Sequence, residues 1–185
     1  MSAKTDNFIK KYSRAAIIEG VRNNVPPSIT LAQAILESGW GESGLTVAAN
    51  NFFGIKADSS WKGDIYNADT HEYYDGVLTY TSDDFRAYKT PLQSFKDHSI
   101  FLKENKRYSN LFDLDFLDYK GWAKGLKSSG YATSPTYAEK LINLIEQYNL
   151  NKFDKRAKSL KTLGYIGLVI LITIFTILLI KKFKK

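Results

Sequence analysis

One carboxylate, Glu37, lies in a stretch of the sequence suited to acid catalysis. It follows an apolar run directly and precedes the turn Gly39-Trp40-Gly41, so we expect it at a helix end against a large apolar ring. Such burial disfavours the charged carboxylate and raises its pKa. An acid still protonated near neutral pH is what leaving-group protonation in glycoside cleavage requires. The alternative is a solvated Glu37 whose charge merely opposes the helix dipole.

A second carboxylate, Glu72, follows Thr70-His71 on the first strand of an expected hairpin. Glycosidases commonly use two carboxyl groups, the second of which activates water or attacks the sugar. The spacing alone does not select Glu72, because five other carboxylates lie near it in the sequence. They are Asp64, Asp69, Asp75, Asp83 and Asp84.

Aromatic side chains are candidates to stack on the apolar faces of sugar rings. The competing interpretation is structural, because most aromatic residues of a small domain belong to its core. The candidates are Trp40, Trp61, Tyr108, Trp122 and Tyr131.

Metal, thiol and dinucleotide chemistry are not expected. The sequence has no cysteine, which excludes disulfides, thiolate nucleophiles and cysteine-ligated zinc. The two histidines, His71 and His98, are too few for a metal cluster without further partners, so we expect no metal and no cofactor. The glycine pattern of residues 39–44 matches G-x-G-x-x-G, but it follows a helix and places Glu42 where a pyrophosphate would lie.

Two helices are expected to carry and support Glu37. The first covers residues 6–22, and the second starts at Pro26-Pro27-Ser28 and ends at Gly39. The expected apolar face of the first helix comprises Phe8, Tyr12, Ala15, Ala16 and either Ile18 or Glu19, and that of the second comprises Ile29, Ala32, Ile35 and Leu36.

The rest of the globular part reads as one small β element followed by more helices. Residues 70–88 are rich in strand-forming side chains around an Asp75-Gly76 turn signal, which predicts a β-hairpin. A helix is expected after Thr90-Pro91, with Leu92, Phe95, Ser99 and Leu102 on one face. Further helices are expected over 116–127 and after Ser134-Pro135, where the serine can cap and the proline fits the first turn.

The C-terminal tail has the length and composition of a membrane span. Residues 162–180 carry no charge, and as a helix they would measure roughly 28 Å, close to the hydrocarbon thickness of a bilayer. Basic residues on both sides leave the orientation undetermined. We therefore expect a globular domain over 1–150, a basic juxtamembrane linker over 151–161, and a transmembrane helix with a basic tail over 162–185, bound to a lipid bilayer through 162–180.

The net charge of +7 does not indicate nucleic-acid binding. Residues 151–185 hold nine Lys and Arg against one acidic residue, whereas residues 1–150 hold 17 against 18. A DNA-binding domain carries its positive charge on the folded surface. The N-terminus shows no apolar signal-peptide region, so we expect either a dedicated export route or delivery in a membrane-containing virus particle, and we favour the latter.

Six stretches of the sequence resemble, in order, family 73 of the glycoside hydrolases. These are the bacterial cell-wall N-acetylglucosaminidases that include flagellar rod-associated muramidases. The stretches cover nearly all of residues 5–150 and are jointly specific. They are LAQAILESGWGES (31–43), NNFFGIK (50–56), THEYYDG (70–76), FRAYKTPLQSFKDHSIFL (85–102), RYSNL (107–111) and GYATSPTYAEKL (130–141).

The resemblance implies a lysozyme-like α+β fold, mainly helical, with a groove beside a small β-hairpin lobe. It implies a general acid at Glu37, a second functional carboxylate at Glu72, and a catalytic or substrate-contacting tyrosine at Tyr131. Ser134 departs from the family, which often has Asp there; we expect a changed cap and unchanged chemistry. The expected substrate-binding positions are Trp40, Asn51, Phe53, Gly54, Tyr108, Trp122 and Tyr137.

The expected activity is cleavage of the β-1,4 bond between N-acetylglucosamine and N-acetylmuramic acid in peptidoglycan glycan strands. Glu37 would protonate the glycosidic oxygen, while Glu72 guides water or assists attack by the substrate's own acetamido group. Two alternatives stay open. A lytic transglycosylase would leave anhydro-muramic ends, and a membrane-tethered wall-binding protein would bind without turnover.

Overall fold

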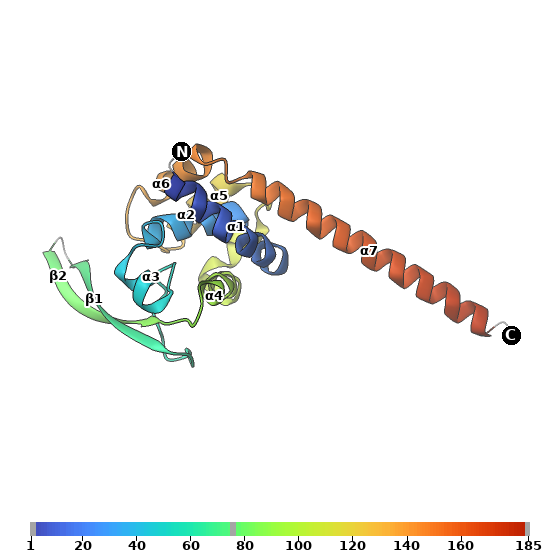
Figure 1. The fold of residues 1–185 in the computed structure, drawn as a ribbon, viewed down its shortest axis with the longest axis horizontal. Coiled ribbons are helices and arrows are strands. Elements are labelled where there is room, and N and C mark those ends of the chain that lie inside the picture. The colour runs from blue at the N-terminus through green and yellow to red at the C-terminus, as the bar shows by residue number, and fades with distance from the viewer. Residues whose placement is uncertain (1–2, 75–76, 184–185) are drawn as a thin grey trace.

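The computed structural model describes residues 3–74 and 77–183; the side chains of 70–81, 169 and 176–183 are not described. The chain is mainly helical with one two-stranded antiparallel sheet, as predicted (Figure 1). In order, the elements are α1 (Ala3–Asn23), α2 (Pro27–Ser38), α3 (Gly44–Ala49), β1 (Ile65–Tyr74), β2 (Val77–Arg86), α4 (Pro91–Glu104), the 3-10 helix η1 (Lys106–Asp113), α5 (Tyr119–Ser128), α6 (Tyr137–Gln147) and α7 (Lys152–Phe183).

Helix α2 lies at the centre of the helical body. It contacts α1, α4, α5, α6 and α7, and residues 27–35 are all buried. Pro27 occupies its first turn, where a missing N–H costs nothing, and Gly39 ends it in the left-handed conformation at φ 56°. Both predicted ends are confirmed, and they place Glu37 in the last turn of the most buried helix.

Helix α1 resolves the choice that the sequence left open for its inner face. Glu19 is buried, whereas Ile18 is 37% exposed. The Glu19 carboxylate accepts hydrogen bonds from Arg22 at 3.2 Å and Asn23 at 3.1 Å. A buried carboxylate that is paired in this way holds the end of α1 just before the left-handed turn at Asn24.

Helix α4 begins with a capping box between Thr90 and Gln93. Leu92 was expected on one face with Phe95, Ser99 and Leu102, but it is not buried with them: it lies in the first turn and is 61% exposed. His98 belongs to the buried face instead, beside Phe95 and the other predicted members, Ser99 and Leu102.

The hairpin and the remaining helices differ from the sequence expectations at their ends. The strands pair from Ile65 opposite Arg86 to Tyr74 opposite Val77, so the hairpin begins five residues earlier than predicted; the Asp75-Gly76 turn lies outside the described residues. Helix α6 begins at Tyr137 without a side-chain cap, so Ser134 does not cap it. Helix α5 starts at Tyr119, after an Asp118 cap that accepts from Gly121 N, and α3 and η1 were not predicted.

Helix α7 runs without a break from the helical body to the end of the described chain (Figure 1). The stretch expected as a linker is therefore helical. It is fixed to the body by the buried Asp154 carboxylate, which accepts from Ser28 N at 2.7 Å and from Ser28 Oγ at 2.6 Å. Ala157 is fully buried and Lys161 bonds Asn24. The hairpin projects from the opposite end of the molecule (Figure 1).

Candidate active site

Glu37 is partly buried in the last turn of α2, with one carboxylate oxygen held by a tyrosine. Tyr137, the first residue of α6, donates from its hydroxyl to Glu37 Oε1 at 3.0 Å. Burial raises the pKa of Glu37, and the Tyr137 bond and the charge of Lys140 oppose that rise. The net direction is upward, which favours the protonated acid that glycoside cleavage requires.

Tyr137 connects Glu37 to two further polar side chains in the core. Gln33 Nε2, one turn earlier on α2, donates to the Tyr137 hydroxyl oxygen at 3.0 Å. Gln33 Oε1 lies 3.0 Å from His98 Nε2 on α4. Burial lowers the pKa of His98 to about 3, so its ring is neutral at physiological pH.

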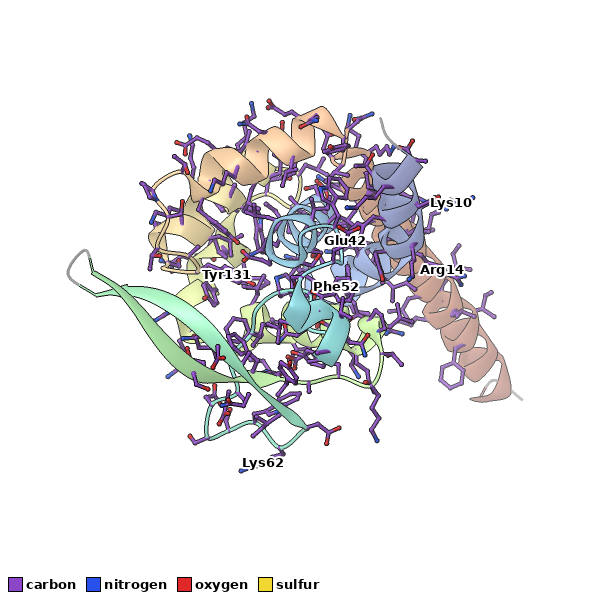
Figure 2. The ribbon with its side chains drawn as sticks, turned by 60° about the vertical axis from the view of Figure 1, so that its left-hand side comes forward. Lys10, Arg14, Glu42, Phe52, Lys62 and Tyr131 are labelled. Carbon is purple, nitrogen blue, oxygen red and sulfur yellow. The ribbon has the colours of Figure 1, made fainter. Side chains whose placement is uncertain are left out.

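Tyr131 lies beside this group of residues, on the side of the body where the hairpin lies (Figure 2). Its ring stacks on Tyr137 with centroids 5.8 Å apart and planes at 19°. Its hydroxyl donates to the Phe53 carbonyl oxygen at 3.3 Å. Burial and the neighbouring Tyr137 and Glu37 raise its pKa well above the usual value, so it stays a neutral donor. The structure therefore brings together Glu37, Tyr131 and Tyr137.

Asn51 supports the loop that presents Phe53. Its amide nitrogen donates to Ile55 O at 3.0 Å and to Arg86 O at 2.8 Å, while its oxygen accepts from the backbone of Phe53 and Ile55. This side chain is 1% exposed. Asn51 thus acts as a structural brace between the loop and the base of β2, while Gly54 is exposed at φ +64°.

Three predicted aromatic positions lie elsewhere or deeper than the resemblance implied. Trp122 has no exposed surface and packs edge-on against Phe112, so it belongs to the core and does not line a groove. Tyr108 is 2% exposed, and its ring centroid lies 6.0 Å from that of Tyr131. Trp40 packs on Phe8 and Tyr148, and the Glu37 carboxylate accepts its hydrogen bond from the Tyr137 hydroxyl.

Glu72 lies on β1 opposite Thr79. Its side chain is outside the described residues, so its assignment stays a prediction. Within the described part of the chain, no group of three or more His, Cys, Asp or Glu side chains lies close enough together to hold a metal ion.

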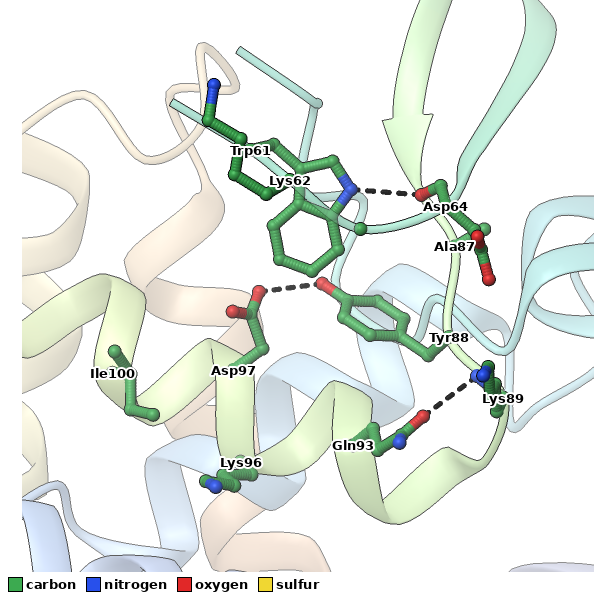
Figure 3. Close-up of a pocket in the computed structure, with 11 residues that line it drawn as sticks. Trp61, Lys62, Asp64, Ala87, Tyr88, Lys89, Gln93, Lys96, Asp97 and Ile100 are labelled. Carbon is green, nitrogen blue, oxygen red and sulfur yellow. Dashed lines mark hydrogen bonds between the residues drawn. The ribbon is translucent and has the colours of Figure 1, made fainter. Parts of the chain in front are cut away.

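A cavity of about 550 Å³ lies beside α4 and is lined by Trp61, one of the aromatic candidates, but not by Glu37, Tyr131 or Tyr137 (Figure 3). Its wall includes Trp61 and Tyr88, whose hydroxyl donates to Asp97 at 2.8 Å. Arg86 pairs with the same carboxylate at 2.9 Å and lies against the Trp61 ring. Because Glu37 is not among its lining residues, this cavity is distinct from the acid.

The sequence reasoning missed Gln33 and treated His98 only as a metal candidate. The available signal was a polar residue inside an apolar helix: Gln33 stands between Ala32 and Ala34 on α2, which is buried on every side. Buried polar groups need partners, and a long amide in that place predicts a hydrogen-bonded contact across the core.

The sequence profile of the glucosaminidase family, described as mannosyl-glycoprotein endo-beta-N-acetylglucosaminidase, matches residues 13–150. The chain is 39% identical over 153 residues to the exo-glucosaminidase LytG of Bacillus subtilis, covering 80% of this chain and 53% of that protein. It is 39% identical over 142 residues to the peptidoglycan hydrolase FlgJ of Vibrio parahaemolyticus, covering 75% of this chain and 44% of that protein. The chain thus spans about half the length of these relatives.

A solved structure shares the fold. The catalytic domain of the autolysin Auto from Listeria monocytogenes superposes with a TM-score of 0.72 at 31% identity, covering 83% of this chain and 89% of that one. The similarity therefore extends over most of this chain.

Proposed function

Since the chain belongs to the glucosaminidase family, we propose that it hydrolyses the β-1,4 bond between N-acetylglucosamine and N-acetylmuramic acid in peptidoglycan, with Glu37 as the general acid. The names of the relatives support this substrate class, because one is a peptidoglycan hydrolase and another an exo-glucosaminidase. The observation that carries the proposal is the Glu37 carboxyl itself, partly buried at a helix end with a raised pKa and a tyrosine on one oxygen.

In the proposed reaction Glu37 gives its proton to the glycosidic oxygen as the bond to the anomeric carbon breaks. The positive charge that develops on the sugar ring is then quenched by water, which returns a proton to the enzyme or solvent. Glu72 either guides that water or orients the substrate's acetamido group for internal attack. Tyr131 contacts the sugar from beside Tyr137.

We also infer that α7 anchors the enzyme in a membrane. The helix is long and apolar enough to span a bilayer, and the window that meets this criterion is not buried against the rest of the described chain. Apolar side chains such as Leu163, Leu168 and Leu171 are more than half exposed to solvent, and lipid would remove that exposure. The proposed task is local opening of the wall, in a host envelope or from a virus particle with a membrane. Immunodetection in purified particles and in host envelopes separates the two locations.

The test of the activity uses the full-length chain in detergent, purified peptidoglycan and mass spectrometry of the new ends. The wild type is expected to release fragments with reducing N-acetylglucosamine ends, and Glu37→Gln is expected to release none. Glu42→Gln is the matched control, because this exposed carboxylate pairs with Lys4 at the surface.

Other outcomes assign the chain to a different class. Anhydro-muramic ends would show a transglycosylase, which differs in product mass by one water. Binding to the wall without release of any product, by the wild type as well as by Glu37→Gln, would show a wall-binding protein.

A further inference from the structure

Three hydrogen bonds in series connect His98 to the proposed acid. They join His98 to Gln33, Gln33 to Tyr137, and Tyr137 to Glu37, each at 3.0 Å. His98 and Gln33 have no exposed surface, and Tyr137 is 2% exposed. The four residues come from three helices, α4, α2 and α6, which are packed around the core. We refer to this set as the buried relay.

The direction of the buried relay follows from its donors. The Gln33 amide nitrogen is used toward Tyr137, so the Gln33 oxygen must accept from His98. A neutral imidazole has one N–H, which must then lie on Nε2. Nδ1 carries only a lone pair, and it is buried without a hydrogen-bond partner among the described residues. The opposite direction would bury an unpaired N–H there, a rarer and costlier arrangement.

Each residue of the buried relay donates to the next one from His98 to Glu37, so Oε1 of the acid already accepts a hydrogen bond. The Tyr137 hydroxyl gives its only hydrogen to Glu37 Oε1, and its oxygen accepts from Gln33. We propose that Gln33 and His98 are positioning residues that lock this direction and so place the transferable proton of Glu37 on Oε2. The inference rests on the proposed function of Glu37 and adds which oxygen acts and what determines it.

A fixed direction of these hydrogen bonds is useful in a general acid. A carboxyl proton on Oε1 could be donated to the tyrosine oxygen, where it would be held away from the substrate. Because Gln33 occupies that oxygen, the competing bond is disfavoured and Oε2 stays available. The Gln33 bond also lowers the pKa of Tyr137, against the larger effect of burial, and so strengthens Tyr137 as a donor to the charged Glu37.

Replacing Gln33 with methionine keeps the length of the side chain and removes both bonds. The Tyr137 hydroxyl then becomes free to accept from Glu37, so we expect kcat to fall about tenfold, the usual ratio for one lost hydrogen bond, with KM unchanged. The weaker donor also raises the pKa of Glu37, which moves the alkaline limb of the kcat profile to higher pH. His98→Phe should act in the same direction, because it leaves the Gln33 oxygen without a donor.

Ser99→Ala is the matched control for a buried polar change on α4. Ser99 is next to His98 and fully buried, but its hydroxyl donates to the Phe95 carbonyl oxygen of its own helix. We expect its kcat and pH profile to equal those of the wild type.

Two spectroscopic measurements on the full-length chain in detergent keep the inference independent of activity. The ¹⁵N shifts of His98 in the wild type should show a protonated Nε2 and a bare Nδ1; the reverse tautomer would overturn the direction of the relay. The ¹³C carboxyl titration of Glu37, assigned with Glu37→Gln, should move to higher pH in Gln33→Met. An unmoved titration in the folded variant would also reject the inference, while product release by the wild type would leave the glucosaminidase proposal standing. Absence of product from the wild type would reject that proposal instead.

Discussion

The hydroxyl of Tyr137 donates to Glu37 Oε1 at 3.0 Å, although the two residues are 100 positions apart in the sequence. Glu37 lies in the last turn of α2 and Tyr137 begins α6, so the bond depends on how these two helices pack. The proposed acid is therefore tuned by the tertiary structure more than by its local sequence.

Replacing Tyr137 with phenylalanine should raise the pKa of Glu37, because it removes a hydrogen bond to the charged carboxylate. The alkaline limb of the pH–rate profile should move up, and the maximal rate should fall about tenfold as the orientation of the carboxyl is lost. Tyr119→Phe is a suitable comparison, since Tyr119 makes the same type of bond to Glu146 on the surface. Equal profiles for the two variants would contradict the assignment of Glu37.

Asp154 predicts a stability change with pH. Burial raises the pKa of this carboxyl to about 7. The folded chain therefore binds the proton more tightly than the unfolded chain does. The stability from this group is complete below about pH 4, the ordinary aspartate pKa, and is lost as the pH rises toward 7. In Asp154→Asn the thermal unfolding temperature should vary less between pH 4 and 7 than it does in the wild type. Asp154→Ala should lower the unfolding temperature at every pH, because it leaves Ser28 unpaired.

Asn51 predicts a combined loss of stability and rate. Asn51→Ala removes the brace of the 51–55 loop and leaves buried backbone groups unpaired, which should cost about 2 to 4 kcal/mol. The Phe53 carbonyl that accepts from Tyr131 should shift as well, so the rate should fall in protein that is still folded. Asn67→Ala on the exposed part of β1 is the control. Denaturant unfolding and peptidoglycan release measure the two effects; a stable, slow variant would assign Asn51 to catalysis alone.

Gly39 tests the helix end that carries Glu37. A Cβ at this position meets nothing within 4 Å, but the backbone is left-handed at φ +56°. Gly39→Ala should therefore cost roughly 1 to 2 kcal/mol through strain alone. Gly44→Ala also has an open environment and an ordinary φ, so thermal unfolding should show no loss for it. A similar loss in both variants would mean that the left-handed strain is not the cause.

The proposed membrane span predicts flotation of the full chain with liposomes. Leu171 lies within the apolar stretch and is 66% exposed. Leu171→Lys should oppose insertion by about 3 kcal/mol and reduce the floated fraction, while Leu171→Ile should not. Flotation that is insensitive to the charge would indicate attachment through the basic residues near 151–161 and not through a span.

Local signals in the sequence predicted the elements that carry the acid. Pro27 and Gly39 act within one turn of the chain, so both ends of α2 and the place of Glu37 were accessible from sequence. Leu92 and Ser134 were misassigned, because the register of a short first turn depends on which residue caps it. The contacts of Gln33 with His98 and Tyr137 could not be predicted, since they join residues 65 and 104 positions apart. The hydrogen bond from Tyr137 to Glu37 could not be predicted for the same reason, since these residues are 100 positions apart.

The unbroken α7 sets the geometry in which such an enzyme would work. From Asp154, fixed to Ser28, to Thr162 at the start of the apolar stretch, the helix rises only about 12 Å. With residues 162–180 in a bilayer, no flexible segment would separate the membrane-spanning part of α7 from the helical body. Diffusion in the plane of the membrane would then move the proposed active site over a wide area at a constant distance from the membrane surface. The depth at which the wall is cut would be determined by the enzyme's own dimensions, and strands in more distant layers would stay out of reach.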